Sequence, residues 1–301
     1  MSTQEKVTIH KLPTGVPGLD EIVGGGLPEY SFNIIAGAPG SGKTTLAHQF
    51  VFANVTPERP ALYFIVLGES AIKMLRYQQQ YTFFDPAKLP GSIRFINLSQ
   101  VVLEQDLGAV LDEITREVEK ANPAVVVVDS FRTMVRNPQS AMDLQAFIQR
   151  LALFLASWQA TTFLIGEYSE DELRDNPIFT VADGLLWMRQ TAERNSIVRK
   201  LQIIKLRGQA SVPGLHTFRI TDAGLQAFSR TFGLTGHRRT SPTDVRLSFG
   251  IPELDKMLGG GVREGDSVLV AGPSGTGKIR ARNSIHSRRY TQWRVGNRRS
   301  L

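Results

Sequence analysis

Apolar runs of strand length alternate with amphipathic stretches along the first half of the chain. The apolar runs predict β-strands at 31–36, 61–67, 92–97, 124–129 and 161–167. Helical spacing of apolar positions predicts helices at 43–54, 70–81, 104–120 and 140–158. Strands that alternate with helices form mostly parallel sheets with helices on both faces, so we expect an α/β fold.

The pattern changes after residue 180, where strands follow one another without helices between them. Three strands are predicted, at 184–189, 197–206 and 216–220, and we expect them to extend the sheet in antiparallel fashion. A polar stretch at 237–245 then predicts a linker. The first domain is therefore expected to span 1–236.

An internal repeat follows this linker. Residues 15–43 read GVPGLDEIVGGGLPEYSFNIIAGAPGSGK, and residues 250–278 read GIPELDKMLGGGVREGDSVLVAGPSGTGK. Asp20 pairs with Asp255 and Lys43 with Lys278, and the shared spacing predicts the start of a second, duplicated domain at 246–278.

The second copy loses its register after Lys278. Residues 279–301 have no amphipathic period and no acid, but they contain seven arginines: Arg280, Arg282, Arg288, Arg289, Arg294, Arg298 and Arg299. We interpret this tail as non-native sequence, such as translation past a frameshift, or as disordered chain. The alternative is a basic arm for nucleic acid or membrane.

Charge and composition narrow the function classes. The net charge of +7 resides in the tail, because without its seven arginines the chain has 28 basic and 28 acidic residues. A neutral body has no general electrostatic attraction for DNA. The chain contains no cysteine, which excludes disulfides and thiolate metal sites. The N-terminus has no apolar signal segment and no run of about 18 apolar residues occurs, so we expect a cytoplasmic protein.

The strongest chemical motif is a glycine-rich loop between a predicted strand and a predicted helix. Glycines let backbone N–H groups point at phosphate oxygens, and the start of the helix adds its positive dipole end. Lys43 is placed to reach the β and γ phosphates, and the Thr44 hydroxyl to ligate Mg²⁺. The predicted ATP-binding residues are Gly37, Ala38, Pro39, Gly40, Ser41, Gly42, Lys43, Thr44 and Thr45.

Carboxylates end three of the predicted strands. Asp129 follows four valines, and we predict that it holds Mg²⁺ together with Thr44. Glu69 is predicted to activate the attacking water, although a helix N-terminal acid is the alternative. Glu167 is interpreted either as a contact to the γ-phosphate or as a surface acid.

A pair of cations lies far from the loop, in the stretch KLRG. Strand alternation places Lys205 and Arg207 on one face, which suits a phosphate tail and its developing charge. Their distance along the sequence favours action on a neighbouring subunit. The alternative is a charged edge strand that resists aggregation.

The second loop, at 272–278, is not expected to catalyse. Ile279 stands where Thr44 stands in the first copy, and isoleucine cannot ligate Mg²⁺.

Taken together, the leader TGVPGLDEIVGGGLP, the loop, the Asp129–Ser130 pair and the stretch IIKLRG resemble the KaiC branch of the RecA superfamily. The resemblance covers about residues 8–230 and resumes at 246–278. It implies tandem RecA-like ATPase domains in a hexamer, with ATP between subunits and with Lys205 and Arg207 reaching a neighbour's phosphates. One departure is Gly68, where the family often has a second glutamate beside Glu69.

The resemblance favours an oligomeric Mg²⁺-dependent ATPase that serves as a signalling or timing switch. The family's autokinase activity belongs to a complete second domain, so autophosphorylation is not expected here. A DNA-dependent ATPase is the alternative; Arg132 and Arg136 favour it, whereas the acidic segment 168–176 opposes it. A truncated chain that never assembles is a third hypothesis.

Overall fold

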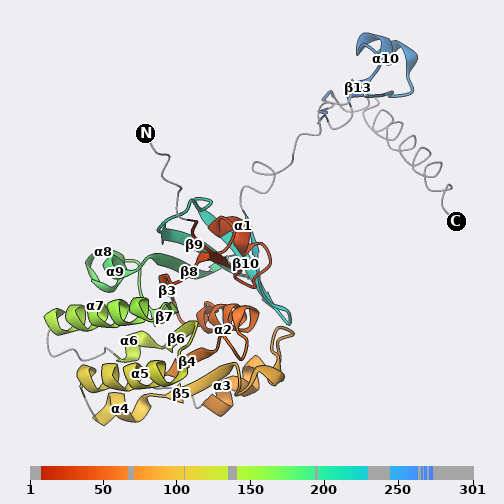
Figure 1. Ribbon diagram of the computed structural model, residues 1–301. Helices are drawn as coiled ribbons and strands as arrows, with labels where there is room; N and C mark the ends of the chain where they lie inside the picture. The colour runs from red at the N-terminus through yellow and green to blue at the C-terminus, as the bar shows by residue number, and fades with distance from the viewer. Residues whose placement is uncertain are drawn as a thin grey trace, which may run out of the picture. The chain divides into compact units, whose positions relative to one another are not determined.

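The computed structural model describes residues 8–66, 71–104, 106–134, 141–193, 196–229 and 245–263, together with 266, 268–269 and 271–273. The chain divides into two compact units, Met1–Phe232 and Gly233–Leu301 (Figure 1). Among the described residues, no helix combines the length and the apolarity needed to cross a bilayer.

A large sheet runs through the described part of the first unit. Its nine strands lie in the order β11-β10-β9-β8-β3-β7-β6-β4-β5. The six strands from β8 to β5 pair in parallel, whereas β9, β10 and β11 pair antiparallel. The strands are β3 (Phe32–Gly37), β4 (Ala61–Ile65), β5 (Ile93–Asn97), β6 (Val125–Asp129), β7 (Thr161–Glu167), β8 (Gly184–Glu193), β9 (Ser196–Leu206), β10 (Leu215–Thr221) and β11 (Gly224–Phe228). A separate two-stranded ribbon pairs β1 (Lys11–Leu12) with β2 (Leu27–Pro28).

Helices cover both faces of this sheet (Figure 1). One apolar core holds side chains of α1 (Leu19–Val23), α2 (Lys43–Asn54) and α3 (Ala71–Gln78). The core on the other face holds those of α5 (Leu107–Ala121), α7 (Ala141–Ser157) and α9 (Ile178–Val181). The shorter elements are α4 (Ser99–Glu104), α6 (Phe131–Met134), α8 (Glu172–Asp175) and a 3-10 turn (Pro86–Lys88). The predicted α/β fold is confirmed.

The valine run of β6 shows why the sequence favours this arrangement. Val125 and Val127 belong to the core under α2, and Val126 and Val128 to the core under α5 and α7. Successive strand side chains point to opposite faces, so a strand buried on both faces must be apolar at every position. A continuous apolar run is therefore the signature of a central parallel strand.

Two predicted boundaries are wrong for physical reasons. The helix expected at 104–120 is α5, which begins three residues later because the Asp106 side chain accepts a hydrogen bond of 2.9 Å from the N–H of Ala109 and caps its start. The short helix α4 before it was not predicted. The antiparallel extension begins one strand later than expected, since β8 pairs in parallel with β3. The extension also gains β11, which the prediction lacked and which follows a turn at Gly224 (φ 91°).

The second unit reproduces the start of the first. It contains β12 (Arg246–Leu247), α10 (Pro252–Met257) and β13 (Val262–Arg263). The pairs Lys11↔Pro28 and Leu12↔Leu27 recur as Arg246↔Arg263 and Leu247↔Val262. The carboxylate of Asp20 accepts from the N–H of Thr14 at 2.8 Å, and that of Asp255 accepts from Phe249 at 2.7 Å. The sequence repeat is therefore a structural repeat.

The apolar face of this repeated motif is buried in the first unit and exposed in the second. Ile22 and Val23 of α1 are 0% exposed, whereas Met257 and Leu258 at the matching positions are 84% and 39% exposed. In the first unit the N–H of Val212 donates to Ile22 O, and that of Ala227 to Pro17 O. The predicted linker (237–245) lies outside the described residues except for Val245, and the loop residues from Ser274 to Ile279 and the basic tail also lie outside them.

One buried titratable residue makes the stability of the first unit sensitive to pH. His48 of α2 is 0% exposed and stacks on Tyr63, with ring centroids 4.6 Å apart. Burial lowers the pKa of His48 to about 3, and the backbone of Thr44 opposes this shift. The folded protein therefore holds a neutral imidazole, whereas the unfolded chain takes up a proton below about pH 6.5.

We expect stability to be full above pH 7 and to fall as the pH drops from 6.5 toward 3. Between pH 7.5 and 5, His48 alone should lower the free energy of unfolding by about 2 kcal/mol. Denaturant unfolding at a series of pH values measures this slope. His48→Phe should flatten it, whereas His10→Gln, at an exposed position, should not. Equal slopes in the wild type and His48→Phe would contradict the assignment.

Candidate nucleotide-binding site

The glycine-rich loop connects β3, in the middle of the sheet, to α2. Gly37 has φ 148°, and a Cβ there would collide with the carbonyl oxygen of Met188 in β8. Gly42 takes the N-cap position of α2 with φ 98° and makes no side-chain capping bond. Both positions require glycine, and no side chain of this N-cap covers the first N–H groups of α2, which suits an anion.

Lys43 is a buried cation at the first position of α2. Its Nζ donates to the carbonyl oxygens of Gly37 at 3.0 Å and Ala38 at 2.8 Å. Burial lowers the pKa of Lys43, and the carboxylates of Glu167 and Asp129 oppose that shift. The ammonium group is thus held over the loop between two acids.

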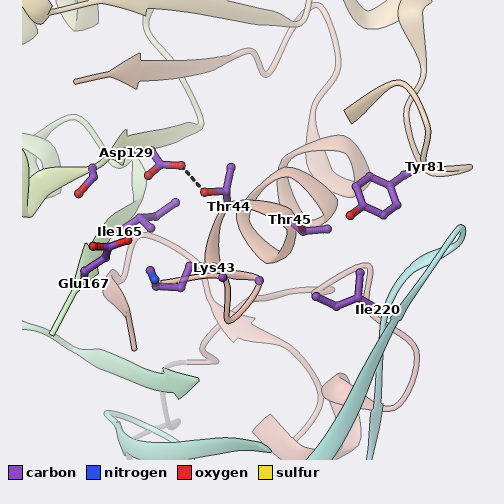
Figure 2. Close-up of a pocket in the computed structure, with 11 residues that line it drawn as sticks. Lys43, Thr44, Thr45, Tyr81, Asp129, Ile165, Glu167 and Ile220 are labelled. Atoms are coloured by element: carbon purple, nitrogen blue, oxygen red, sulfur yellow. Dashed lines mark hydrogen bonds between the residues drawn. The ribbon is translucent and has the colours of Figure 1, made fainter. Parts of the chain in front are cut away.

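Thr44 and Asp129 meet although 85 positions separate them in sequence. The Thr44 hydroxyl donates to Oδ2 of Asp129 at 2.8 Å (Figure 2). β6 delivers Asp129 to this point because its last residue pairs with Ile165 of β7, two residues before the end of that neighbouring strand. Two hard oxygen ligands therefore lie side by side at the start of α2, the helix that follows the glycine-rich loop (the P-loop).

A tyrosine that sequence reasoning missed joins this pair. The Tyr63 hydroxyl, from β4, also donates to Oδ2 of Asp129 at 2.8 Å. Burial and the charge of Asp129 raise the pKa of Tyr63 well above its usual value, so the phenol remains a donor. In the sequence Tyr63 is one aromatic residue within an apolar strand, and nothing local distinguishes it from a core residue.

Lys43, Thr44 and Asp129 line one cavity of about 340 Å³. In Figure 2, Asp129 and Glu167 lie at one end of it, and Tyr81 and Ile220 lie at the other. The lining consists of Gly40, Gly42, Lys43, Thr44, Thr45, Tyr81, Asp129, Ser130, Ile165, Glu167 and Ile220. The cavity therefore has a charged end next to Lys43 and a less polar end beyond the loop.

The predicted acids divide into described and undescribed residues. Glu167 ends β7 and lines the cavity, so it lies with Lys43 and Asp129 at the charged end. Glu69 lies outside the described residues, as does Gly68. Tyr81 and Ile220, which come from the α3–β5 connection and from β10, were not predicted to be site residues.

Lys205 and Arg207 lie at the amino-terminal end of the parallel strands, whereas the P-loop lies at their carboxyl-terminal end. β9 ends at Leu206, so strand alternation does not place Arg207; its Nη1 instead donates to Oδ1 of Asp183 at 3.0 Å. Asp183 in turn accepts from the N–H of Phe32, the first residue of β3. The P-loop begins at the other end of β3, about 16 Å along the strand.

The two cations nonetheless form a pair. Lys205 donates to the carbonyl oxygen of Thr180 at 3.1 Å. Burial and the neighbouring charge of Arg207 lower the pKa of Lys205, while Asp183 opposes the shift. Within one chain the pair therefore remains apart from the cavity that holds Lys43.

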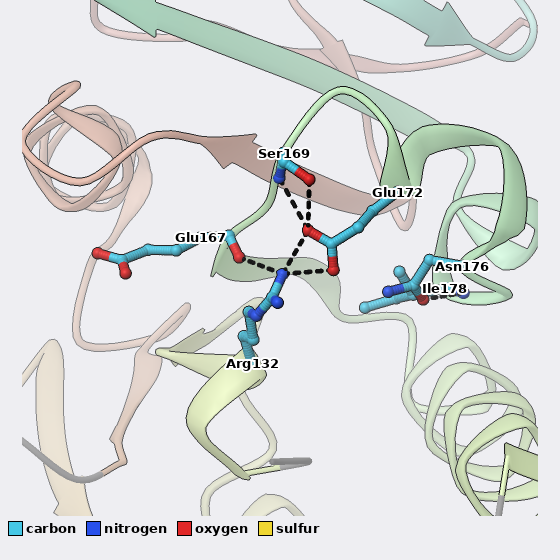
Figure 3. A network of polar contacts seen from close by, with 6 residues as sticks. All are labelled: Arg132, Glu167, Ser169, Glu172, Asn176 and Ile178. Carbon is cyan, nitrogen blue, oxygen red and sulfur yellow. Dashed lines mark hydrogen bonds and ion pairs between the residues drawn. The ribbon is translucent and has the colours of Figure 1, made fainter.

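Arg132 ties together the strand ends that carry Asp129 and Glu167. Its Nη1 donates to both carboxylate oxygens of Glu172, at 2.6 and 2.7 Å, and to the carbonyl oxygen of Glu167 at 2.7 Å (Figure 3). Ser169 donates to the same carboxylate from its N–H and its hydroxyl. Burial alone would raise the pKa of Glu172, but the hydrogen bonds from Arg132 and Ser169 lower it.

This network bears on the alternative of a DNA-binding surface. The charge of Arg132 is engaged by Glu172 within the acidic segment 168–176, and its guanidinium lies 5.1 Å from the ring centre of Tyr168. Arg136, the other cation considered for DNA, lies outside the described residues.

The sheet order, the glycine-rich loop and the adjoining Thr44–Asp129 pair together define a RecA-type P-loop NTPase. Comparison with known proteins agrees with that class. The family model for the KaiC ATPase matches residues 12–231. The chain belongs to the KaiC family of ATPases.

Curated relatives share this assignment. The circadian clock oscillator protein KaiC of Picosynechococcus sp. is 30% identical over 283 residues, which cover 90% of this chain and 54% of the relative. KaiC 1 of Synechocystis sp. is 30% identical, with 90% and 53% covered. KaiC of Prochlorococcus marinus subsp. pastoris is 27% identical, with 92% and 56% covered. The chain thus spans about half the length of these relatives, and the similarity extends into the second unit.

Removing the Arg132 guanidinium should loosen both strand ends. Because the ion pair is partly exposed, we expect Arg132→Ala to lower the free energy of unfolding by about 1 kcal/mol, and by less at high salt. Denaturant unfolding at two ionic strengths measures this change. Arg116→Ala, which removes a surface ion pair with Glu113 on α5, is the matched control and should have almost no effect. Equal losses in the two variants would contradict the proposed anchoring.

Proposed function

We propose that this chain binds ATP with Mg²⁺ in the P-loop cavity and hydrolyses it as a subunit of a ring-shaped homo-oligomer, most simply a hexamer. The observation that carries the proposal is the 2.8 Å contact between the Thr44 hydroxyl and Asp129 beside a buried lysine. In a P-loop enzyme these groups have defined tasks toward phosphate and metal.

The charged end of the cavity suits a triphosphate. We propose that the loop and the start of α2 contact the phosphates through backbone N–H groups. The residues are Gly37, Ala38, Pro39, Gly40, Ser41, Gly42, Lys43, Thr44 and Thr45, of which Pro39 has no N–H to donate. Lys43 would exchange its two carbonyl acceptors for phosphate oxygens, which are stronger partners for an ammonium group. Because Lys43 is buried, little water competes for that contact.

Thr44 and Asp129 fit a magnesium ion because both present hard oxygen atoms. When bound, Mg²⁺ would neutralise charge on the β and γ phosphates. Thr44 would ligate it directly, while Asp129 would accept a hydrogen bond from a ligand of the ion or from Thr44. The less polar end of the cavity suits the adenine ring of ATP, since Tyr81 and Ile220 line it. Tyr81 also stacks on Phe83, with ring centroids 5.2 Å apart.

Hydrolysis needs a carboxylate near the terminal phosphate. We assign water activation to Glu69 and contact with the γ-phosphate to Glu167, which lines the charged end of the cavity. Lys205 and Arg207 would act on the nucleotide of a neighbouring subunit, because in their own subunit they lie at the end of the sheet away from the P-loop. An assembly that places ATP between subunits couples nucleotide state to assembly.

The biological role follows from the same coupling. An interface that changes with hydrolysis can be read by a protein partner, which suits a signalling or timing switch. The names of the relatives, circadian clock oscillator proteins, support a timing role. We further propose the domain division 1–236, 237–245 and 246–278.

Native mass spectrometry with MgATP tests the central proposal. Lys43→Ala should lose nucleotide binding and, with it, the oligomer. Arg207→Ala should keep both the nucleotide and the oligomer but lose hydrolysis by at least about 1000-fold, as for an arginine supplied in trans. Normal hydrolysis by Arg207→Ala would contradict the role of Arg207 in a neighbouring subunit. A monomer that hydrolyses ATP would contradict the proposal that catalysis needs an oligomer. Hydrolysis stimulated by single-stranded DNA would favour the alternative recombinase function.

A pair of isosteric variants separates the two glutamates. Glu69→Gln should lower kcat by about 100-fold or more while nucleotide binding persists, since a general base contributes about that factor. Glu167→Gln should have a smaller effect on kcat. Single-turnover hydrolysis and fluorescent-nucleotide binding measure the two properties. The reverse order of effects would make Glu167 the water-activating residue.

A further inference from the structure

Tyr63 brings a fully buried phenol to the carboxylate of Asp129. It lies in the middle of β4 and is 0% exposed, and its hydroxyl donates to Oδ2 of Asp129 at 2.8 Å. The Thr44 hydroxyl donates to the same oxygen at 2.8 Å. One carboxylate oxygen thus accepts from a residue of the P-loop helix and from a residue of the neighbouring strand.

The tyrosine ring packs in a cluster with two other rings, which also contact each other at 6.0 Å between centroids. His48, one turn after Thr44 in α2, stacks on it with an interplanar angle of 1°. Phe95 of β5 packs at 5.3 Å between ring centroids. Burial and this packing restrict movement of the ring, so the hydroxyl is a well-placed donor to the Asp129 carboxylate.

Packing alone does not explain a tyrosine at this position. A phenylalanine would pack against His48 and Phe95 equally well without a polar atom to bury. The hydroxyl has a charged acceptor, and a fixed donor restricts rotation of a carboxylate that otherwise turns freely about its last torsion.

We propose that Tyr63 is a positioning residue that holds the Asp129 carboxylate against Thr44, where magnesium and the phosphates would be bound. This inference rests on the proposed function and adds to it the group that orients the metal-holding acid. Partners of this outer kind orient metal ligands and tune metal affinity by about 10–100-fold.

The test is Tyr63→Phe in the full chain, which removes one oxygen atom. Binding of a fluorescent ATP analogue is titrated with Mg²⁺, and Mn²⁺ binding is followed by electron paramagnetic resonance. We expect the half-saturating metal concentration to rise by about tenfold. Nucleotide binding in EDTA should not change, because the phenol does not contact the loop. Tyr77→Phe, at a 54% exposed position on α3, is the matched control and should behave as wild type.

The outcomes separate this inference from the proposed function. A wild type whose nucleotide binding ignores Mg²⁺ would overturn the proposed function itself. A metal-dependent wild type with an unchanged Tyr63→Phe would overturn the positioning role alone. If Tyr63→Phe does not fold, 4-aminophenylalanine and 4-methylphenylalanine at residue 63 make the same comparison at equal size. Only the amino group can donate, so metal affinity should be retained there and reduced with the methyl group; equal affinities would contradict the role.

Discussion

The parallel pairing of β3, β7, β6 and β4 aligns the carboxyl ends of four strands that are far apart in sequence. One edge of the sheet therefore receives the P-loop from β3, Glu167 from β7 and Asp129 from β6. The alignment depends on burial, because the apolar side chains of the central strands pack into one or other of the two cores. A shift of one residue in β6 would exchange its two valine faces and would turn Asp129 away from Thr44.

The same geometry separates two groups of charges. Lys43 lies at the carboxyl edge, whereas Lys205 and Arg207 lie near the amino end of β3, where Asp183 links Arg207 to Phe32. The six extended residues of β3 keep its two ends apart, so these two groups of charges cannot meet within one subunit. Any shared action on one nucleotide must join two copies of the chain, and that is the physical basis for proposing a ring.

The second unit isolates what the leader motif can do without the rest of a domain. Its strand pairing and its Asp255 contacts repeat those of the first unit, so local sequence is sufficient to form this strand–helix–strand motif. Burial is different: Met257 is exposed, while Ile22 lies under β11 and the residues around Val212. The motif forms from short-range hydrogen bonds, and its apolar face requires elements that come much later in the first domain.

The sequence by itself determined the α/β class, the loop with Lys43 and Thr44, and the repeat, because each depends on local periodicity or on glycine at fixed positions. It also indicated Asp129, since an acid that ends a four-valine run must reach a strand end. Only the tertiary structure decided that Tyr63 contacts that acid, that Tyr81 and Ile220 line the other end of the cavity, and that Arg207 pairs with Asp183. These contacts join residues from separate parts of the chain, and their distances depend on register and sheet order, which no local pattern encodes.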